Sequence, residues 1–186
     1  MKFIELFDKE TFLPDWDKIF SIKEFKDMET CQQSKVWHKE GNVREHTILV
    51  TLAMLNYLSS KLSIKPSDNP TYIMLMSAAI CHDLGKPSTT KFDEEKDDCT
   101  TKYHGAVGAR ITRSIFFDDD FYLREQVCYM VRHHMDLHHI FDEHVNTTRK
   151  LIELSHGRVP LSGMLALNVC DSYGSVNGIE TKKTID

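Results

Sequence analysis

Two things that this chain of 186 residues lacks narrow its class. No run approaches the roughly 18 consecutive apolar residues of a membrane-spanning helix, and the N-terminus, interrupted by charge, lacks the apolar stretch of a signal peptide. No basic block occurs and the formal net charge is −5, so a large electrostatic footprint for duplex nucleic acid is not expected. We therefore expect a cytoplasmic protein with no membrane partner and no extended nucleic-acid contact.

Cysteine is sparse and scattered, and no Cys-x-x-Cys pair occurs. The five cysteines are Cys31, Cys81, Cys99, Cys128 and Cys170. An odd number at wide spacing argues against a disulfide framework and against a structural zinc finger. Three of them lie inside apolar runs, where a buried free thiol is the plain interpretation. This usage fits a reducing environment.

The amino-acid composition and the spacing of the apolar residues together predict a soluble all-α domain. Hydrophobic residues make up 41% of the chain and charged residues 27%, as in globular proteins, and the length suits one domain. Helical periodicity and residues typical of helix ends predict helices over 42–62, 71–84, 104–116, 121–135, 145–155 and 160–173. The polar and charged segment 88–103 is expected to be a surface loop. We expect residues 1–35 to form one or two short helices packed on a core domain at 36–173, and residues 174–186 to form a loose tail.

Helix ends are marked by specific residues. Asn42 followed by Glu45 resembles a capping box, and the run Asp118–Asp120 is a candidate cap for the helix that follows it. Gly85 and Pro87 are expected to end the apolar helix before them, since glycine is a permissive residue at a C-terminus and proline cannot continue a helix.

The most informative feature is the pair His82–Asp83, where that apolar helix is expected to end. A buried carboxylate without a partner is costly, and a metal cation is one compensating partner. Adjacent helix positions point about 100° apart, so both side chains can reach one or two ions only where the backbone leaves the helix. Asp83 is then the natural bridge between two ions.

Further candidate ligands lie on other predicted helices. His46 is in a first turn, His104 precedes the third helix, His133–His134 close the fourth, and Asp171 lies near the end of the last. Ligands on several facing helices converge in this way when a bundle holds a metal. Imidazoles with carboxylates suit iron, manganese, zinc, cobalt or nickel better than calcium. The sequence therefore predicts one or two divalent transition metal ions.

Four spaced strings carry a resemblance to a known family. They are WHKEGNVREHT from Trp37, HDLGKPSTT from His82, YHGAVG from Tyr103 and VRHH from Val131. They resemble the HD superfamily of metal-dependent phosphohydrolases, most closely in motif the HD domain attached to some bacterial tRNA nucleotidyltransferases. The resemblance implies an HD-type bundle of about five to seven helices over roughly 36–173. These 186 residues include no nucleotidyltransferase domain, so the tRNA-end chemistry of such relatives is not expected to carry over.

The resemblance also implies a ligand set. The four metal ligands of the family would correspond to His46, His82, Asp83 and Asp171. His104 and one of His133 and His134 match the additional histidines of members that hold two ions. Motif order favours His133, whereas His134 shares the apolar face of its helix, so the choice between them stays open.

The reaction that the resemblance implies is hydrolysis of a phosphate ester with metal-activated water as the nucleophile. We expect a phosphomonoesterase or phosphodiesterase, including one for 2′,3′-cyclic phosphates, that acts on a nucleotide or a short nucleic-acid end. Asp83, Lys86 and His104 are the candidate catalytic residues, with His104 as general acid if it is not a ligand. Candidates for binding the substrate phosphate are Arg44, Lys86, Thr89, Thr90 and Arg132.

Some alternatives stay open. A minority of the superfamily are di-iron oxygenases with the same ligands, and a catalytically silent domain that binds a nucleotide or a partner protein is a third hypothesis. Lys86 can instead be a surface lysine in a salt bridge. We expect His38 to be structural or at the rim, and solvated side chains at His138, His139, His144 and His156. A homodimer is one possible assembly.

Overall fold

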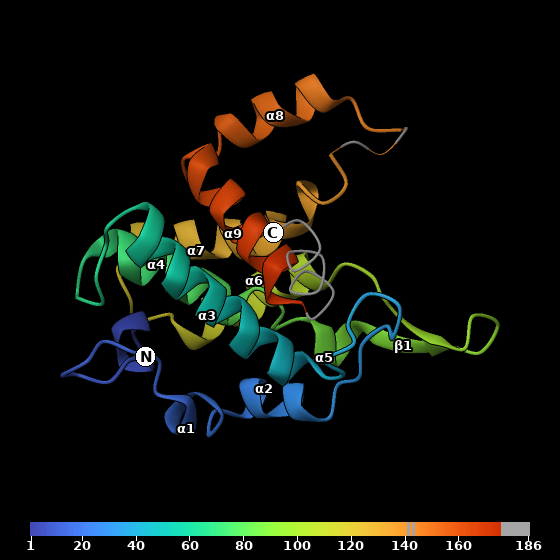
Figure 1. The fold of residues 1–186 in the computed structure, drawn as a ribbon, viewed down its shortest axis with the longest axis horizontal. Coiled ribbons are helices and arrows are strands. Elements are labelled where there is room, and N and C mark those ends of the chain that lie inside the picture. The colour runs from blue at the N-terminus through green and yellow to red at the C-terminus, as the bar shows by residue number, and fades with distance from the viewer. Residues whose placement is uncertain (141, 143, 176–186) are drawn as a thin grey trace.

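Helices dominate the structure, a computed structural model that describes residues 1–140, 142 and 144–175 (Figure 1). The long helices are α3 (Val43–Lys61), α4 (Pro70–Cys81), α6 (His104–Ile115), α7 (Phe121–His133), α8 (Thr147–Ser155) and α9 (Leu161–Gly174). Short helical segments are η1 (Phe3–Leu6), α1 (Trp16–Ile19), α2 (Lys23–Lys26), η2 (Asp27–Glu29), α5 (Lys86–Thr89) and η3 (His134–Asp136). The all-α class predicted from the sequence is confirmed. Residues 176–186, most of the predicted tail, lie outside the described residues.

Side-chain caps fix where the main helices begin. The Asn42 side chain accepts a hydrogen bond from the backbone N–H of Glu45 at 2.9 Å, and Asp120 accepts one from Leu123 at 3.0 Å. Each such cap contributes about 1 kcal/mol by satisfying a backbone donor that has no helical partner. The predicted cap at Asn42 is confirmed, and within the run Asp118–Asp120 it is Asp120 that caps α7. The cap at Asn42 also sets the position of the first turn of α3, which carries His46.

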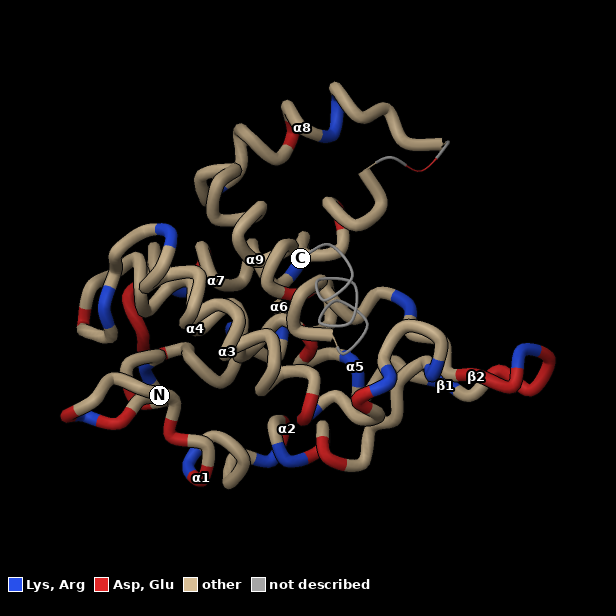
Figure 2. The backbone as a smooth tube through the Cα atoms, viewed as in Figure 1, with Lys and Arg blue, Asp and Glu red and all other residues tan. Residues whose placement is uncertain are grey.

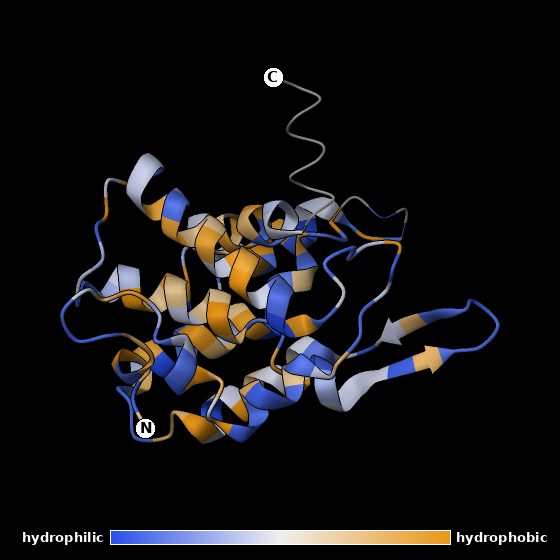
Figure 3. Cartoon of the chain, turned by 60° about the horizontal axis from the view of Figure 1, so that its bottom comes forward, coloured by the Kyte–Doolittle hydropathy of each residue, from blue (hydrophilic) through white to orange (hydrophobic). Residues whose placement is uncertain are grey.

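Helix α4 forms the centre of the bundle. Every residue from Tyr72 to Cys81 is buried, because α4 is apolar nearly all round and packs against α3, α7 and α9. Figure 3 shows hydrophobic residues gathered toward the interior of the helical bundle. The N-terminal segment contributes to the same core through the buried side chains of Phe3, Leu6 and Phe25. The end of α4 is therefore deep in the molecule.

The predicted surface loop over 88–103 is wrong. The segment contains α5 and an antiparallel hairpin of β1 (Thr90–Asp93) and β2 (Asp98–Thr101), which projects from the bundle (Figure 1). Thr90 and Phe92 before a four-residue turn, and two threonines after it, favour strands. The Oγ1 atoms of Thr90 and Thr101 lie 2.9 Å apart across the pair. The charged turn between the strands (Figure 2) hid this short alternation.

Two other predicted boundaries shift, and both shifts affect the functional region. Helix α4 ends at Cys81 rather than at residue 84, so His82 and Asp83 lie in the turn that follows it. Helix α9 continues through Gly174. No helix among the described residues is long and apolar enough to cross a membrane.

Candidate metal centre

Six buried side chains converge where α4 ends. They are His46 on α3, His82 and Asp83 after α4, His104 at the start of α6, His134 after α7, and Asp171 on α9. Their ligand atoms form two groups of three, and within each group these atoms lie within 4.8 Å of one another. The structure thus brings together side chains from five separate segments of the chain.

The first group contains His46, His82 and Asp171. The Nε2 atom of His46 lies 2.9 Å from Oδ1 of Asp171, and Nε2 of His82 lies 3.7 Å from the same oxygen. His46 and His82 are 1% and 0% exposed. Two imidazole nitrogens and one carboxylate oxygen therefore share one buried volume, as the ligands of a transition metal do.

The second group contains Asp83, His104 and His134. The Nε2 atoms of the two histidines lie 3.1 Å apart, at 3.5 and 3.7 Å from Oδ1 of Asp83. The other oxygen of this carboxylate, Oδ2, lies 3.2 Å from His82 and 3.7 Å from His46. Asp83 therefore stands between the two groups, with one oxygen toward each.

The unsatisfied polar atoms fit a cation. Within the described residues, Nε2 of His82 and both carboxylate oxygens of Asp83 are buried and have no hydrogen-bond partner. Leaving such a carboxylate unsatisfied costs several kcal/mol, and a buried imidazole nitrogen adds to the cost. These three atoms belong to neighbouring side chains and face the two groups. The donor set thus suits divalent metal ions, and we refer to the two groups together as the metal centre.

Backbone carbonyls orient two of the histidines. The Nδ1 atom of His82 lies 2.8 Å from the carbonyl oxygen of Ala79, and that of His134 lies 2.7 Å from the carbonyl of Val131. A carbonyl only accepts hydrogen bonds, so each Nδ1 donates a proton, and Nε2 is the nitrogen that faces the ligand groups and could bind a metal. Metal-binding histidines usually show this arrangement.

Two glycines allow the elements around the centre to approach closely. A Cβ atom on Gly85 would lie 2.1 Å from the carbonyl oxygen of His104, and one on Gly105 would lie 2.6 Å from that of Arg132. Gly85 has an ordinary helical φ of −84°. Its role is therefore the close contact between the end of α4 and the start of α6, and not the conformational freedom that the sequence suggested.

The electrostatic environment differs between the groups. Burial opposes charge on His46, but hydrogen bonds to Asp171 and Glu40 prevail and raise its pKa to about 9. Burial lowers the pKa of His134 to about 3, and it also lowers the pKa of His104. Burial acts to raise the pKa of Asp83, but the charges of His82 and Lys86 outweigh it and hold that pKa well below its ordinary value.

Lys86 lies against the centre. It is buried, its Nζ atom is 2.7 Å from Oδ2 of Asp83, and it donates a hydrogen bond to Oε1 of Gln33 at 2.6 Å. The contact with Asp83 is an ion pair that lacks hydrogen-bond geometry. A surface position for this lysine is therefore wrong.

The structure does not bring the other predicted phosphate-binding residues to the centre. Arg44 pairs with Glu29 at 3.0 Å and lies over the ring of Phe20, because its position on α3 points away from His46. The hydroxyl of Thr89 donates to the carbonyl of Gly85 at 2.9 Å, and Thr90 contacts Thr101. The side chain of Arg132 is exposed.

The two adjacent histidines at the end of α7 separate. His134 is in the centre, whereas Nδ1 of His133 lies 2.7 Å from Oδ2 of Asp136 and its ring contacts Tyr129. The apolar face of the helix, rather than the order of the motif, identified the histidine that points inward.

Sequence reasoning missed three polar side chains around the centre. His138 is exposed, as predicted, but its Nε2 atom also lies 2.9 Å from Oδ2 of Asp171, a contact that the prediction did not include. Glu40 contacts Nδ1 of His46 at 2.9 Å, and Gln33 holds Lys86. The spacing His134-x-x-x-His138 was the one signal for His138. The other predicted solvated histidines, His139, His144 and His156, are exposed.

A helical bundle with a buried cluster of four histidines and two aspartates defines a class of candidate metal-binding enzymes. The model of the HD domain family matches residues 43–167, so this chain belongs to the HD domain family. That family consists largely of metal-dependent hydrolases, and its domains bind divalent metals. In two further comparisons, no curated protein and no solved structure matched the chain.

Proposed function

We propose that this protein is a phosphohydrolase with two divalent metal ions that cleaves a phosphomonoester or phosphodiester of a nucleotide or a nucleic-acid end. The observation that carries the proposal is the Asp83 carboxylate. It is buried, it accepts no hydrogen bond from the described residues, and one oxygen faces each group of three ligands. Oδ2 also forms an ion pair with Lys86, whereas Oδ1 has only histidines near it among the described residues, and the position of one oxygen toward each group of ligands favours two ions.

In this proposal, each of the six side chains of the metal centre would bind a metal ion. A bound divalent cation lowers the pKa of water and neutralises charge on a phosphoryl group. His46, His82 and Asp171 would hold one ion, His104 and His134 the other, and Asp83 both. We therefore propose His104 as a ligand rather than as the general acid.

Lys86 supports an anionic substrate. Its ammonium group is fixed between Asp83 and Gln33 at the edge of the centre. An ammonium is a compact charge that binds phosphate oxygens without directional preference, so we propose that it stabilises the substrate phosphate there. Acidic and basic residues are interspersed along the backbone (Figure 2), which favours a small substrate or a short end over an extended nucleic acid.

The test is turnover by protein loaded with Mn²⁺, Co²⁺ or Zn²⁺. The panel would contain p-nitrophenyl phosphate, bis-p-nitrophenyl phosphate, 2′,3′-cyclic nucleotides, and nucleoside mono- and triphosphates. We expect hydrolysis of monoesters or diesters in preference to triphosphates. Lys86→Gln should raise KM for that substrate, whereas Lys91→Gln, which alters an exposed lysine of the hairpin, should leave KM unchanged.

Two outcomes would contradict the proposal. Metal-loaded protein that cleaves no substrate of the panel, while its metal content shows two ions, would favour a silent binding domain. Oxygen uptake by the iron-loaded protein together with a mixed-valent iron signal would favour the di-iron oxygenase.

A further inference from the structure

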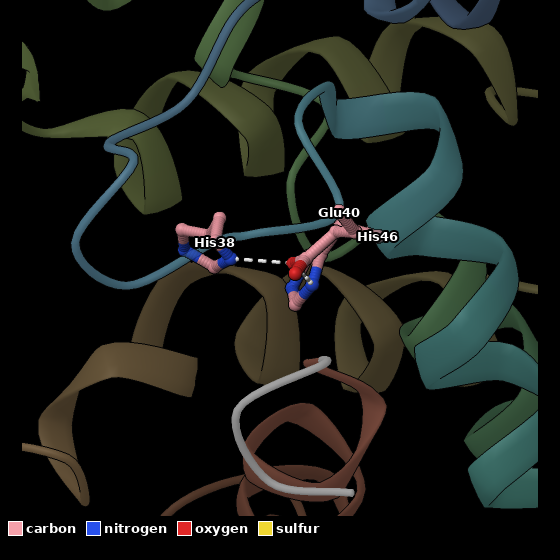
Figure 4. A group of neighbouring side chains, drawn as sticks. All are labelled: His38, Glu40 and His46. Carbon is pink, nitrogen blue, oxygen red and sulfur yellow. Dashed lines mark hydrogen bonds and ion pairs between the residues drawn. The ribbon is translucent and has the colours of Figure 1, made fainter. Parts of the chain in front are cut away.

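A carboxylate outside the metal centre contacts one of its histidines. Oε1 of Glu40 lies 2.9 Å from Nδ1 of His46, on the opposite side of the imidazole from Asp171. Figure 4 shows His38 and His46 both directed at this carboxylate. The Glu40 side chain is only 3% exposed, so water competes little for the contact. The His46 ring thus has a carboxylate at each nitrogen.

The position of each histidine in its helix explains why His46 needs a carboxylate partner, whereas His82 and His134 do not. The carbonyls that hold His82 and His134 lie in the last turns of α4 and α7, where a helix leaves its carbonyls without helical partners. His46 lies in the first turn of α3, where the carbonyls already accept helical N–H groups, as that of Asn42 accepts the N–H of His46. A side chain from outside the helix must therefore orient this ring.

The loop that carries Glu40 is built to hold it. Nδ1 of His38 lies 2.8 Å from the same Oε1 atom, so two imidazoles fix one carboxylate oxygen. Gly41 follows with a φ of +98°, which favours glycine, and its carbonyl accepts the backbone N–H of Gln33 at 3.0 Å. The side chain of Gln33 also donates to the carbonyl of Asn42 at 3.1 Å, which ties the loop to the start of α3.

We propose that Glu40 is a positioning residue for the metal centre, held by His38, which keeps the proton of His46 on Nδ1 and so directs Nε2 to the metal. An ionised carboxylate only accepts hydrogen bonds, so both contacting Nδ1 atoms donate. The inference rests on the proposed metal-binding function. Carboxylates that orient a metal-binding histidine typically contribute about 10–100-fold to metal affinity.

The same three side chains offer a competing arrangement. One ligand atom each from His38, Glu40 and His46 lies within 4.8 Å of the others, a spacing that a cation can also bridge. In that arrangement His46 would have to bind one ion through Nδ1 and another through Nε2. A neutral imidazole has one proton and one free lone pair, which favours the hydrogen-bonded arrangement.

The experiment compares Glu40→Gln with Glu45→Gln, a matched control next to His46 whose side chain is exposed. Zn²⁺ affinity would be measured by competition with a chromophoric chelator, and the imidazole nitrogens would be followed by ¹⁵N NMR of the zinc-loaded protein. We expect Glu40→Gln to weaken binding of one ion about 10–100-fold and to shift the His46 Nδ1 signal. Signals of His82 and His134, which have carbonyl partners, should not shift, and Glu45→Gln should match the wild type.

A second variant keeps the test decisive if Glu40→Gln does not fold. His38→Gln leaves the carboxylate in place, and we expect a smaller loss of affinity with the same shift of the His46 signal. Wild-type affinity and an unshifted His46 signal in the folded variants would overturn the inference, as would zinc coordinated by Nδ1 of His38 in the wild type. If the wild type binds no zinc, the proposed function itself fails, so the two failures are distinguishable.

Discussion

The two groups of the metal centre are built from similar ligands but have opposite electrostatics. In the first group, His46 lies between Asp171 and Glu40, and its pKa rises to about 9 because both carboxylates favour its charged form over the effect of burial. In the second, His104 and His134 share one oxygen of Asp83, and burial lowers the pKa of both histidines, to about 3 for His134. The surroundings of the first group therefore stabilise a positive charge on its histidine, whereas those of the second group favour neutral histidines.

This difference predicts an order of metal binding. Carboxylates facing a site lower the cost of placing a cation there, whereas two neutral imidazoles offer lone pairs with little charge compensation. We expect the group of His46, His82 and Asp171 to bind the tighter ion. The second group would then bind its ion mainly through imidazole lone pairs and the shared Asp83.

The largest effect is expected from Asp83→Asn, because both groups share this carboxylate. The variant keeps the shape but removes the charge, so it should lose both ions. Activity should fall by more than the roughly 10–100-fold that is typical when an outer partner of a metal ligand is lost. Metal content by elemental analysis and turnover measure this. Asp97→Asn, in the exposed turn of the hairpin, is the control and should behave as wild type.

The second largest effect is expected from variants that remove one histidine from only one of the two ligand groups. His134→Ala should bind one ion with nearly the affinity of the tighter wild-type site, whereas His46→Ala should keep only the weaker one. Titration with Zn²⁺ in a calorimeter would measure both the number of ions and their affinities. Equal residual affinity in the two variants would refute the proposed difference between the groups.

A moderate effect is expected in the pH dependence of stability without metal. Because the pKa of His46 is raised from 6.5 to about 9, its contribution is fully present below pH 6.5 and is lost as the pH rises through 9. His134 acts in the opposite sense: its contribution is present above pH 6.5 and is lost as the pH falls toward 3.

Urea unfolding in the presence of a chelator, from pH 4 to pH 10, would measure this dependence. His46→Gln should remove the alkaline loss of stability, and His134→Gln should remove the acidic loss. A parallel loss of stability in His46→Gln and the wild type between pH 6.5 and 9 would show that His46 does not cause the alkaline loss.

The smallest effect is expected from His133→Ala. This side chain is partly exposed and pairs with Asp136 outside the centre, an interaction that is worth at most about 1 kcal/mol at such exposure. The variant should bind two ions with wild-type affinity, in contrast to its neighbour His134→Ala. Loss of an ion in His133→Ala would show that the two histidines exchange roles when metal binds.

Much of the fold was predictable because its signals are local. The caps at Asn42 and Asp120 and the apolar run of α4 indicate helices from a few neighbouring residues each. The hairpin was missed because its strands are four residues long and its charged turn dominates the composition of the segment. The end of α4 was placed too late because Gly85 and Pro87 were expected to end the helix, whereas turns begin already at His82.

The site residues that could be predicted from the sequence are those that lie in recognisable motifs. Residues that end or begin helices, such as His82 and His104, were identified as candidates from their strings. The partners that depend on tertiary contacts were not: Gln33 and Glu40 reach the centre from a loop, and His138 does so across the bundle. Arg44 was misassigned because its nearness to His46 in the sequence suggested nearness in space. Two positions along a helix, its side chain lies on another face of α3 and pairs with Glu29.

Anomalous diffraction at the zinc absorption edge, from crystals of the zinc-loaded protein, tests the central claim most directly. We predict two peaks, one bounded by His46, His82 and Asp171 and the other by His104 and His134, with the Asp83 carboxylate between them. A single peak in fully loaded crystals, or peaks that do not contact Asp83, would contradict this account.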